Sequence, residues 1–121
     1  MRSTLVSHVD YGDLMGLIEN NPKFCPSDLD GIAERNGKFL VLEWKRSQEK
    51  VSFGQQRMLQ ALAAQPNFIV LIVRGDTDNG INIQEFFLVQ PHGHCIKIGT
   101  TKQSFIDYYK QWFEWADGEK K

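Results

Sequence analysis

The sequence feature that most constrains the fold is a pair of continuous apolar runs with one helical segment between them. Residues 39–42 and 68–73 are apolar at every position, which is typical of strands covered on both faces. Residues 52–65 repeat apolar side chains at helical spacing and are followed by Pro66. A strand, a helix and a strand in this order predict a right-handed crossover between parallel strands. The expected helical stripe consists of Phe53, Met58, Leu59 and Leu62.

A β-hairpin is expected just before this helix. Asn36-Gly37 separates two extended runs within residues 28–46, and this dipeptide suits both positive-φ positions of a type I′ turn. Directly opposed residues share a face of a hairpin, and the side-chain period along each strand is two. Counting outward from the turn therefore brings four polar side chains to one face. The opposed pairs are Asp30 with Glu43 and Asp28 with Lys45.

The N-terminal part of the chain predicts a short first helix over residues 11–19. Leu14, Leu17 and Ile18 recur there at helical spacing. The sequence Asn-Asn-Pro at 20–22 ends the run, because proline removes a backbone donor and disfavours helix before it.

The C-terminal part predicts two strands and a third helix. Residues 84–90 and 94–98 are expected to be strands on the antiparallel side of the sheet. Thr100 and Gln103 match a capping box at the start of the helix. Together with the crossover, these patterns predict an α/β fold with a mixed β-sheet flanked by helices. The apolar stripe of the third helix consists of Phe105, Ile106, Tyr109, Trp112, Phe113 and Ala116.

Size and charge limit the classes of protein that fit. The chain has 121 residues, of which 41% are apolar, which is enough for one core, so residues 1–121 are expected to form a single domain. The net charge is −1, with 14 basic and 15 acidic residues, so no general excess of positive charge points to nucleic acid. Affinity for a polyanion would need a local basic patch and metal ions held by carboxylates.

The expected location is the cytoplasm. The longest apolar run, residues 68–73, is far shorter than the roughly 20 residues of a membrane-spanning helix, and the N-terminus lacks an apolar secretory segment. Cys25 and Cys95 show no Cys-x-x-Cys spacing, which suits a reducing compartment better than a disulfide framework or a structural zinc site.

The opposed carboxylates of Asp30 and Glu43 predict a cation site. Side chains paired across a sheet have Cβ atoms about 4.5 to 5.5 Å apart, and like charges opposed there repel. A hard ion such as Mg²⁺ or Mn²⁺ prefers oxygen ligands and would relieve that repulsion. Lys45 on the same face can orient a water molecule or neutralise developing negative charge. These are the groups that phosphodiester hydrolysis needs.

At this point the sequence resembles a family. Pro-Ser-Asp-Leu-Asp-Gly at 26–31, followed by Glu43-Trp44-Lys45, is similar to the motif of the PD-(D/E)XK nuclease superfamily, and the likeness covers residues 13–73. The resemblance implies a restriction-endonuclease-like core and Mg²⁺- or Mn²⁺-dependent cleavage of DNA, with an endonuclease favoured. It also implies that Asp30 and Glu43 bind the metal, that the Trp44 backbone carbonyl is a further ligand, and that Lys45 is the catalytic lysine.

Several auxiliary residues follow from the same resemblance. We favour Asp30 as the essential aspartate because it faces Glu43, with Asp28 as an auxiliary ligand. Glu19 corresponds to a position that often adds an acid to the site, and either Gln55 or Gln56 can supply a glutamine that reaches the metal or the phosphate. The family usually has a strand before the Asp-bearing strand, and residues 23–25 are the stretch available for it. Independently of the resemblance, four basic residues can line a phosphate path, although each is equally an ordinary surface charge: Arg46, Lys50, Arg57 and Arg74.

Alternative interpretations are open from the sequence. A binding module that has lost activity can keep the same fold. A calcium-binding regulatory domain is less favoured because the loop lacks the ligand spacing of an EF-hand. His92 and His94 flank a glycine and are expected to be exposed turn residues. The aromatic stripe of the third helix can pack within one chain or be shared in a homodimer, which would suit an enzyme that cuts two strands.

Overall fold

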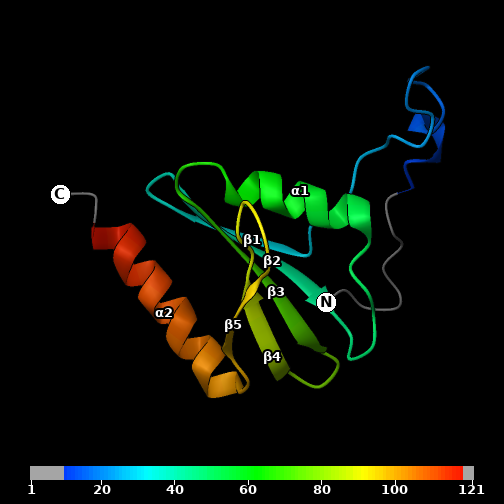
Figure 1. Ribbon diagram of the computed structural model, residues 1–121. Coiled ribbons are helices and arrows are strands. Elements are labelled where there is room, and N and C mark those ends of the chain that lie inside the picture. Colours follow the sequence, from blue (N-terminus) through cyan, green and yellow to red (C-terminus); the bar gives the residue numbers. More distant parts are fainter. Residues whose placement is uncertain (1–9, 119–121) are drawn as a thin grey trace.

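The computed structural model describes residues 10–118, which form one mixed sheet with a long helix on each side (Figure 1). The strand order in the sheet is β1-β2-β3-β4-β5. The α/β class and the flanking helices agree with the prediction. The strands are β1 (Gly31–Arg35), β2 (Lys38–Lys45), β3 (Phe68–Asp76), β4 (Asn82–Leu88) and β5 (Ile96–Gly99), and the helices are α1 (Phe53–Ala63) and α2 (Lys102–Gly118).

The predicted hairpin is formed by β1 and β2. Asn36 and Gly37 have φ angles of 53° and 80°, as a type I′ turn requires. The strands are antiparallel, and their register runs from Arg35 opposite Lys38 to Gly31 opposite Leu42. This is the register that counting from the turn predicts.

The predicted crossover joins β2 through α1 to β3. β2 and β3 are parallel, with Phe39 opposite Phe68 and Lys45 opposite Arg74. Ser52 caps α1 by accepting a 3.2 Å hydrogen bond from the Gln55 backbone N–H. These two strands lie at the centre of the sheet, which explains why their sequences are apolar on both faces.

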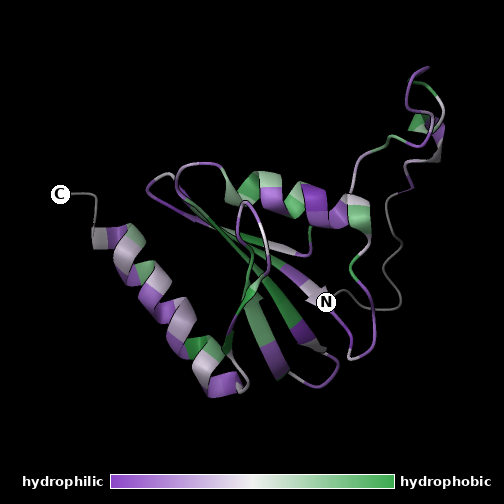
Figure 2. Ribbon diagram, viewed as in Figure 1, coloured by the Kyte–Doolittle hydropathy of each residue, from purple (hydrophilic) through white to green (hydrophobic). Residues whose placement is uncertain are grey.

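Two apolar cores lie on the two faces of the sheet, and the central strands are hydrophobic where they meet them (Figure 2). The residues that alternate along each strand divide between these cores, as the period of two requires. The core under α1 consists of Val41, Leu59, Val70, Ile72 and Val89, and the core under α2 consists of Leu40, Leu71, Val73, Ile83, Phe86, Phe105, Trp112 and Ala116.

Phe53 does not join the apolar stripe of α1, contrary to the prediction. Its exposed fraction is 76%, whereas Leu59 is fully buried. Each residue turns an α-helix by about 100°, so Phe53 lies on the opposite side from Gln55, which faces the sheet. The stripe against the sheet therefore begins at Gln55 and continues through Met58, Leu59 and Leu62.

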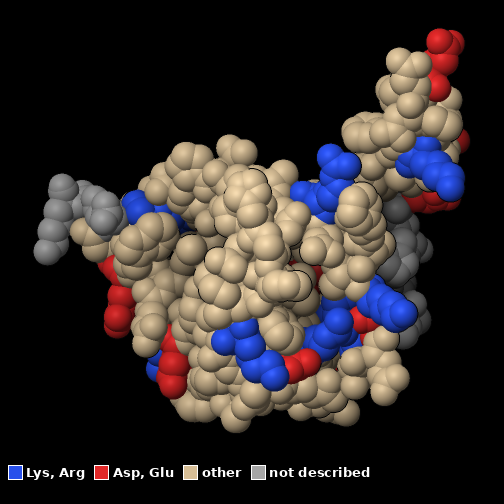
Figure 3. All heavy atoms as spheres, viewed as in Figure 1, with Lys and Arg blue, Asp and Glu red and all other residues tan. Residues whose placement is uncertain are grey.

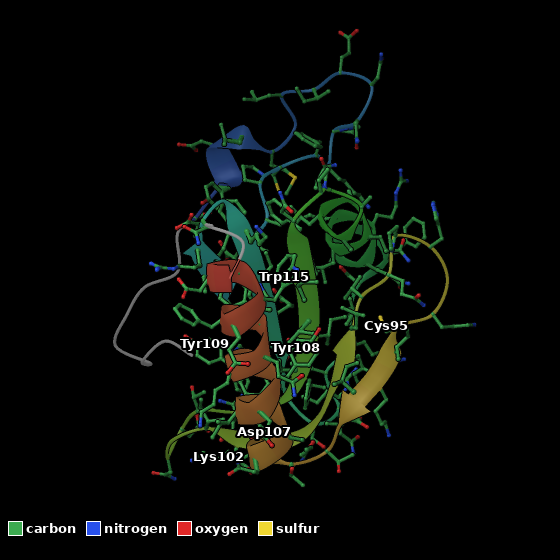
Figure 4. The ribbon with its side chains drawn as sticks, turned by 90° about the vertical axis from the view of Figure 1, so that its left-hand side faces the viewer. Cys95, Lys102, Asp107, Tyr108, Tyr109 and Trp115 are labelled. Atoms are coloured by element: carbon green, nitrogen blue, oxygen red, sulfur yellow. The ribbon has the colours of Figure 1, made fainter. Side chains whose placement is uncertain are left out.

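The C-terminal strands and α2 form as predicted, with shifts at their ends. The predicted capping box at Thr100 and Gln103 is wrong by one residue, because Thr101 and Ser104 supply it. Thr101 Oγ1 accepts a 3.0 Å hydrogen bond from the Ser104 N–H, and Ser104 Oγ accepts one of 3.1 Å from the Thr101 N–H. Along α2, Tyr108 lies toward the sheet and Tyr109 on the opposite side (Figure 4). The predicted stripe is therefore wrong at Tyr109 and Phe113, whose exposed fractions are 47% and 43%.

The predicted first helix is wrong. Only a short 3-10 helix, η1 (Gly12–Leu14), forms there, and Leu17 is 66% exposed. Gly16 has a φ angle of 81°, which breaks a right-handed helix. The segment projects away from the sheet (Figure 1), so its apolar stripe has no core to pack against, and a helix this short is marginal without packing. Residues 23–25 do not form the extra strand either.

The structure also bears on membrane helices and on the state of the cysteines. None of the helices within residues 10–118 is long and apolar enough to cross a membrane. Cys25 and Cys95 are free thiols. The outermost parts of the expected 1–121 domain, residues 1–9 and 119–121, lie outside the described residues.

Candidate metal site

Asp30 lies immediately before β1, at the point where the hairpin ladder ends. Its Oδ2 accepts a 2.8 Å hydrogen bond from the backbone N–H of Trp44. Since Gly31 is opposite Leu42, one further step in the register places Asp30 beside Glu43, as predicted. The aspartate therefore replaces a backbone partner at the end of β2, and its carboxylate is held there by the strand itself.

Glu43 is buried, although it is a carboxylate. It lies on the α1 face of β2, and only 4% of the residue is exposed. Its Oε2 accepts a 2.6 Å hydrogen bond from Gln55 Nε2 and lies 3.5 Å from Lys45 Nζ. Its Oε1 is also buried and has no hydrogen-bond partner within residues 10–118. A buried carboxylate oxygen without a partner is costly, and a water molecule or a bound ion can satisfy it.

The surroundings of Glu43 raise the pKa of its carboxyl above the ordinary value. Burial is the largest cause, and the negative charge of Asp30 adds to it. The charge of Lys45 and the hydrogen bonds from Lys45 and Gln55 act in the opposite direction. The charge of Asp30 thus disfavours the ionised form of Glu43, and a cation bound between the two carboxylates would remove that cost.

Lys45 supplies the positive charge of the site. It is buried in β2 on the same face as Glu43, and its Nζ lies 3.6 Å from Glu49 Oε2 as well as 3.5 Å from Glu43 Oε2. Glu43 and Glu49 are thus two acids beside one ammonium group, and Asp30 adds a further negative charge next to Glu43. The cluster keeps an excess of negative charge, which favours a divalent cation.

The Trp44 backbone carbonyl can act as a further ligand. In an extended strand the N–H and C=O of one residue point to the same side, and the Trp44 N–H points to Asp30. Its indole lies on the other face of the sheet, where its ring centroid is 6.3 Å from that of Phe105. The side chain thereby anchors β2 to α2 while the backbone faces the carboxylates.

The structure distinguishes the two candidate glutamines. Gln55 reaches Glu43, whereas Gln56 is exposed on the outer side of α1. Asp28 and Glu19 are exposed and form no hydrogen bond or ion pair within residues 10–118. The expected opposition of Asp28 and Lys45 is not part of the ladder, which ends at Gly31, because the chain before Asp30 leaves the sheet.

The site offers few protein side chains that could coordinate a metal ion. Within the described part of the chain, no group of three or more His, Cys, Asp or Glu side chains is arranged to hold a metal. Asp30 and Glu43 therefore provide two carboxylates, and the remaining ligands would be the Trp44 carbonyl, water and substrate. A site of this kind suits Mg²⁺, which keeps several waters and binds through one or two carboxylates.

The predicted basic path is partly used for internal contacts. Arg46 forms a bidentate pair with Asp78 at 3.0 and 3.1 Å. Arg74 donates to the backbone carbonyls of Arg46 and Glu49 and so fixes the loop after β2. Lys50 is exposed and has no ion pair within residues 10–118. In Figure 3, Lys and Arg side chains lie beside Asp and Glu side chains in the lower part of the view.

Sequence reasoning did not identify Glu49 as part of the site. The signal was available, because Glu49 follows Lys45 by four residues, but the segment is a loop and that spacing carries meaning only in a helix. His92 and His94 are exposed in the connection before β5, as expected.

Comparisons of the chain with protein-family models, with curated proteins and with solved structures find no match. The function therefore has to be argued from the site.

Proposed function

We propose that this protein is a metal-dependent nuclease that hydrolyses phosphodiester bonds in DNA as an endonuclease. The observation that supports the proposal is the buried, unpartnered Oε1 of Glu43 beside Asp30 and Lys45. In this interpretation β1, β2, α1 and β3 are a restriction-endonuclease-like core. A cytoplasmic location and a homodimer belong to the same proposal.

Each residue of the site has a role in this proposal. Asp30, Glu43 and the Trp44 carbonyl would hold Mg²⁺ or Mn²⁺, which fits the partnerless oxygen and the raised pKa of Glu43. The bound ion supplies charge stabilisation at the phosphoryl group and a more acidic water. Lys45 orients the attacking water or neutralises the developing charge, while Gln55 holds the Glu43 carboxylate in place.

The experiment is incubation of the purified protein with linear, circular, single-stranded and branched DNA in Mg²⁺, Mn²⁺, Ca²⁺ or EDTA. Cleavage in Mg²⁺ or Mn²⁺ is expected to vanish with EDTA and with Glu43→Ala. Lys45→Ala should lower the cleavage rate by about 10²- to 10³-fold, the usual cost of losing one group that stabilises transition-state charge. Lys110→Ala removes an exposed lysine of α2, on the other face of the sheet from Glu43, and serves as the matched control.

Two other outcomes of this experiment would contradict the proposal. Undiminished cleavage by Lys45→Ala would overturn the mechanism. If the wild-type protein cleaves none of these substrates in any metal, the nuclease proposal fails, and a binding module on the same fold replaces it.

A further inference from the structure

Phe53 has the largest exposed fraction, 76%, among the large apolar side chains of residues 10–118. It is the first residue of α1 and lies on the side that faces away from the sheet. Burial of a phenylalanine side chain would contribute to stability, but the core under α1 is filled without it. The ring therefore contributes no packing to the core under α1 and is open to a ligand.

The position of Phe53 is fixed by contacts of the two residues before it. The Ser52 hydroxyl caps the helix directly before it, and Val51 packs against the core. One turn further along, the Arg57 guanidinium lies over the ring at 5.8 Å from its centroid. α1 contains no aspartate or glutamate, so its outer face combines an aromatic surface with positive charge. That combination complements a nucleobase and its phosphate.

The same helical turn also reaches the candidate metal site. Gln55 is two residues from Phe53 and donates to Glu43, so the first turn of α1 carries the contact to that site on its inner side and the Phe53 ring on its outer side. A strand whose phosphate lies at Asp30 and Glu43 would pass the N-terminal end of α1.

We propose that Phe53, with Arg57 beside it, stacks on an unpaired base of the DNA strand that is bound at the candidate metal site. This inference rests on the proposed nuclease function and adds its substrate class. An unpaired base offers a free aromatic face, whereas a base inside a duplex must first be unstacked at a cost. The enzyme therefore prefers single-stranded or frayed DNA to an intact duplex.

The test measures binding and cleavage separately. A single-stranded oligonucleotide containing 2-aminopurine is titrated in Ca²⁺ or EDTA, since the fluorescence of this base reports its stacking. Phe53→Ala is expected to weaken binding about 5- to 150-fold, which corresponds to the about 1 to 3 kcal/mol of base–aromatic stacking, and to abolish the fluorescence change. Phe53→Trp should retain both. Ile96→Ala, an exposed apolar residue on β5 at the other edge of the sheet, is the matched control.

In Mg²⁺, Phe53→Ala is expected to raise KM for the single strand and leave cleavage of a blunt duplex unchanged. Wild-type binding by Phe53→Ala, or an equal loss on single strand and duplex, would overturn the inference while leaving the nuclease intact. Conversely, a Phe53-dependent fluorescence change without any cleavage would support base stacking and refute the nuclease. Absence of any binding to DNA by the wild-type protein would overturn both.

Discussion

Gln55 Nε2 donates a 2.6 Å hydrogen bond to Glu43 Oε2, and this contact ties the first turn of α1 to the strand that carries the candidate acids. It orients the carboxylate, since one oxygen is used by Gln55 and Lys45 and the other has no partner within residues 10–118. The helix and the strand thus position a ligand oxygen between them.

Replacement of Gln55 by alanine should release the Glu43 carboxylate from this orientation. Partners of this kind commonly account for about 10- to 100-fold in metal affinity or activity, so a fall of that size is expected in Mn²⁺ affinity, measured by titration calorimetry. Gln56→Ala is the control, because Gln56 is exposed on the same helix. Equal effects of the two variants would show that the Gln55 contact has no functional role.

Substitution of Asp30 and of Asp28 should likewise have different effects on metal binding. Asp30→Asn keeps an oxygen that can accept from the Trp44 N–H but loses the charge, so the fold is expected to survive while metal-induced thermal stabilisation disappears. Asp28→Asn should behave as wild type, since Asp28 is exposed and lies outside the ladder. A thermal shift assay with and without Mn²⁺ tests both, and the reverse pattern would make Asp28 the essential acid.

Glu43→Gln should stabilise the metal-free protein at neutral pH. The raised pKa of Glu43 means that its contribution to stability is complete below the ordinary value of 4.5 and is lost as the pH rises through the higher value in the folded protein. The neutral variant avoids that loss. In EDTA we expect its Tm to exceed that of wild type by about 4 °C, which is about 1 kcal/mol in a domain of this size.

The pH dependence supplies the control for this prediction. The difference in Tm should be small near about pH 4 and grow toward about pH 8, because only the wild type ionises at this position. Added Mn²⁺ should raise the Tm of the wild type and not of Glu43→Gln. A difference that does not change with pH would mean that packing, not charge, separates the two proteins.

Gly75 is required at the bulge in β3. It follows Arg74, which fixes the loop after β2. Its φ angle is 156°, and a Cβ there would collide with the backbone carbonyl of Asn82. Gly75→Ala should therefore cost about 3 kcal/mol or more in the free energy of unfolding, measured by urea denaturation. Gly54→Ala in α1 meets no atom within 4 Å and should stabilise by about 0.5 to 1 kcal/mol. Similar stabilities of the two variants would contradict this account.

The local pattern of the sequence was enough to predict the hairpin, the crossover and the position of Asp30 beside Glu43. The type I′ turn at Asn36 and Gly37 fixes the register, and a fixed register fixes which side chains share a face. The two apolar runs likewise required strands covered on both faces. These features depend on neighbours close in sequence or directly opposed, so that counting residues was sufficient.

Tertiary structure alone decided which of those side chains are buried and which have partners. Helical spacing placed both Phe53 and residues 11–19 on apolar stripes, but the core under α1 is filled without Phe53, and nothing in the described chain covers Leu17. The choice of Gln55 over Gln56 and the partnerless oxygen of Glu43 depend on how α1 is rotated on the sheet. Periodicity gives the faces of an element, whereas burial and charge depend on the elements that pack against it.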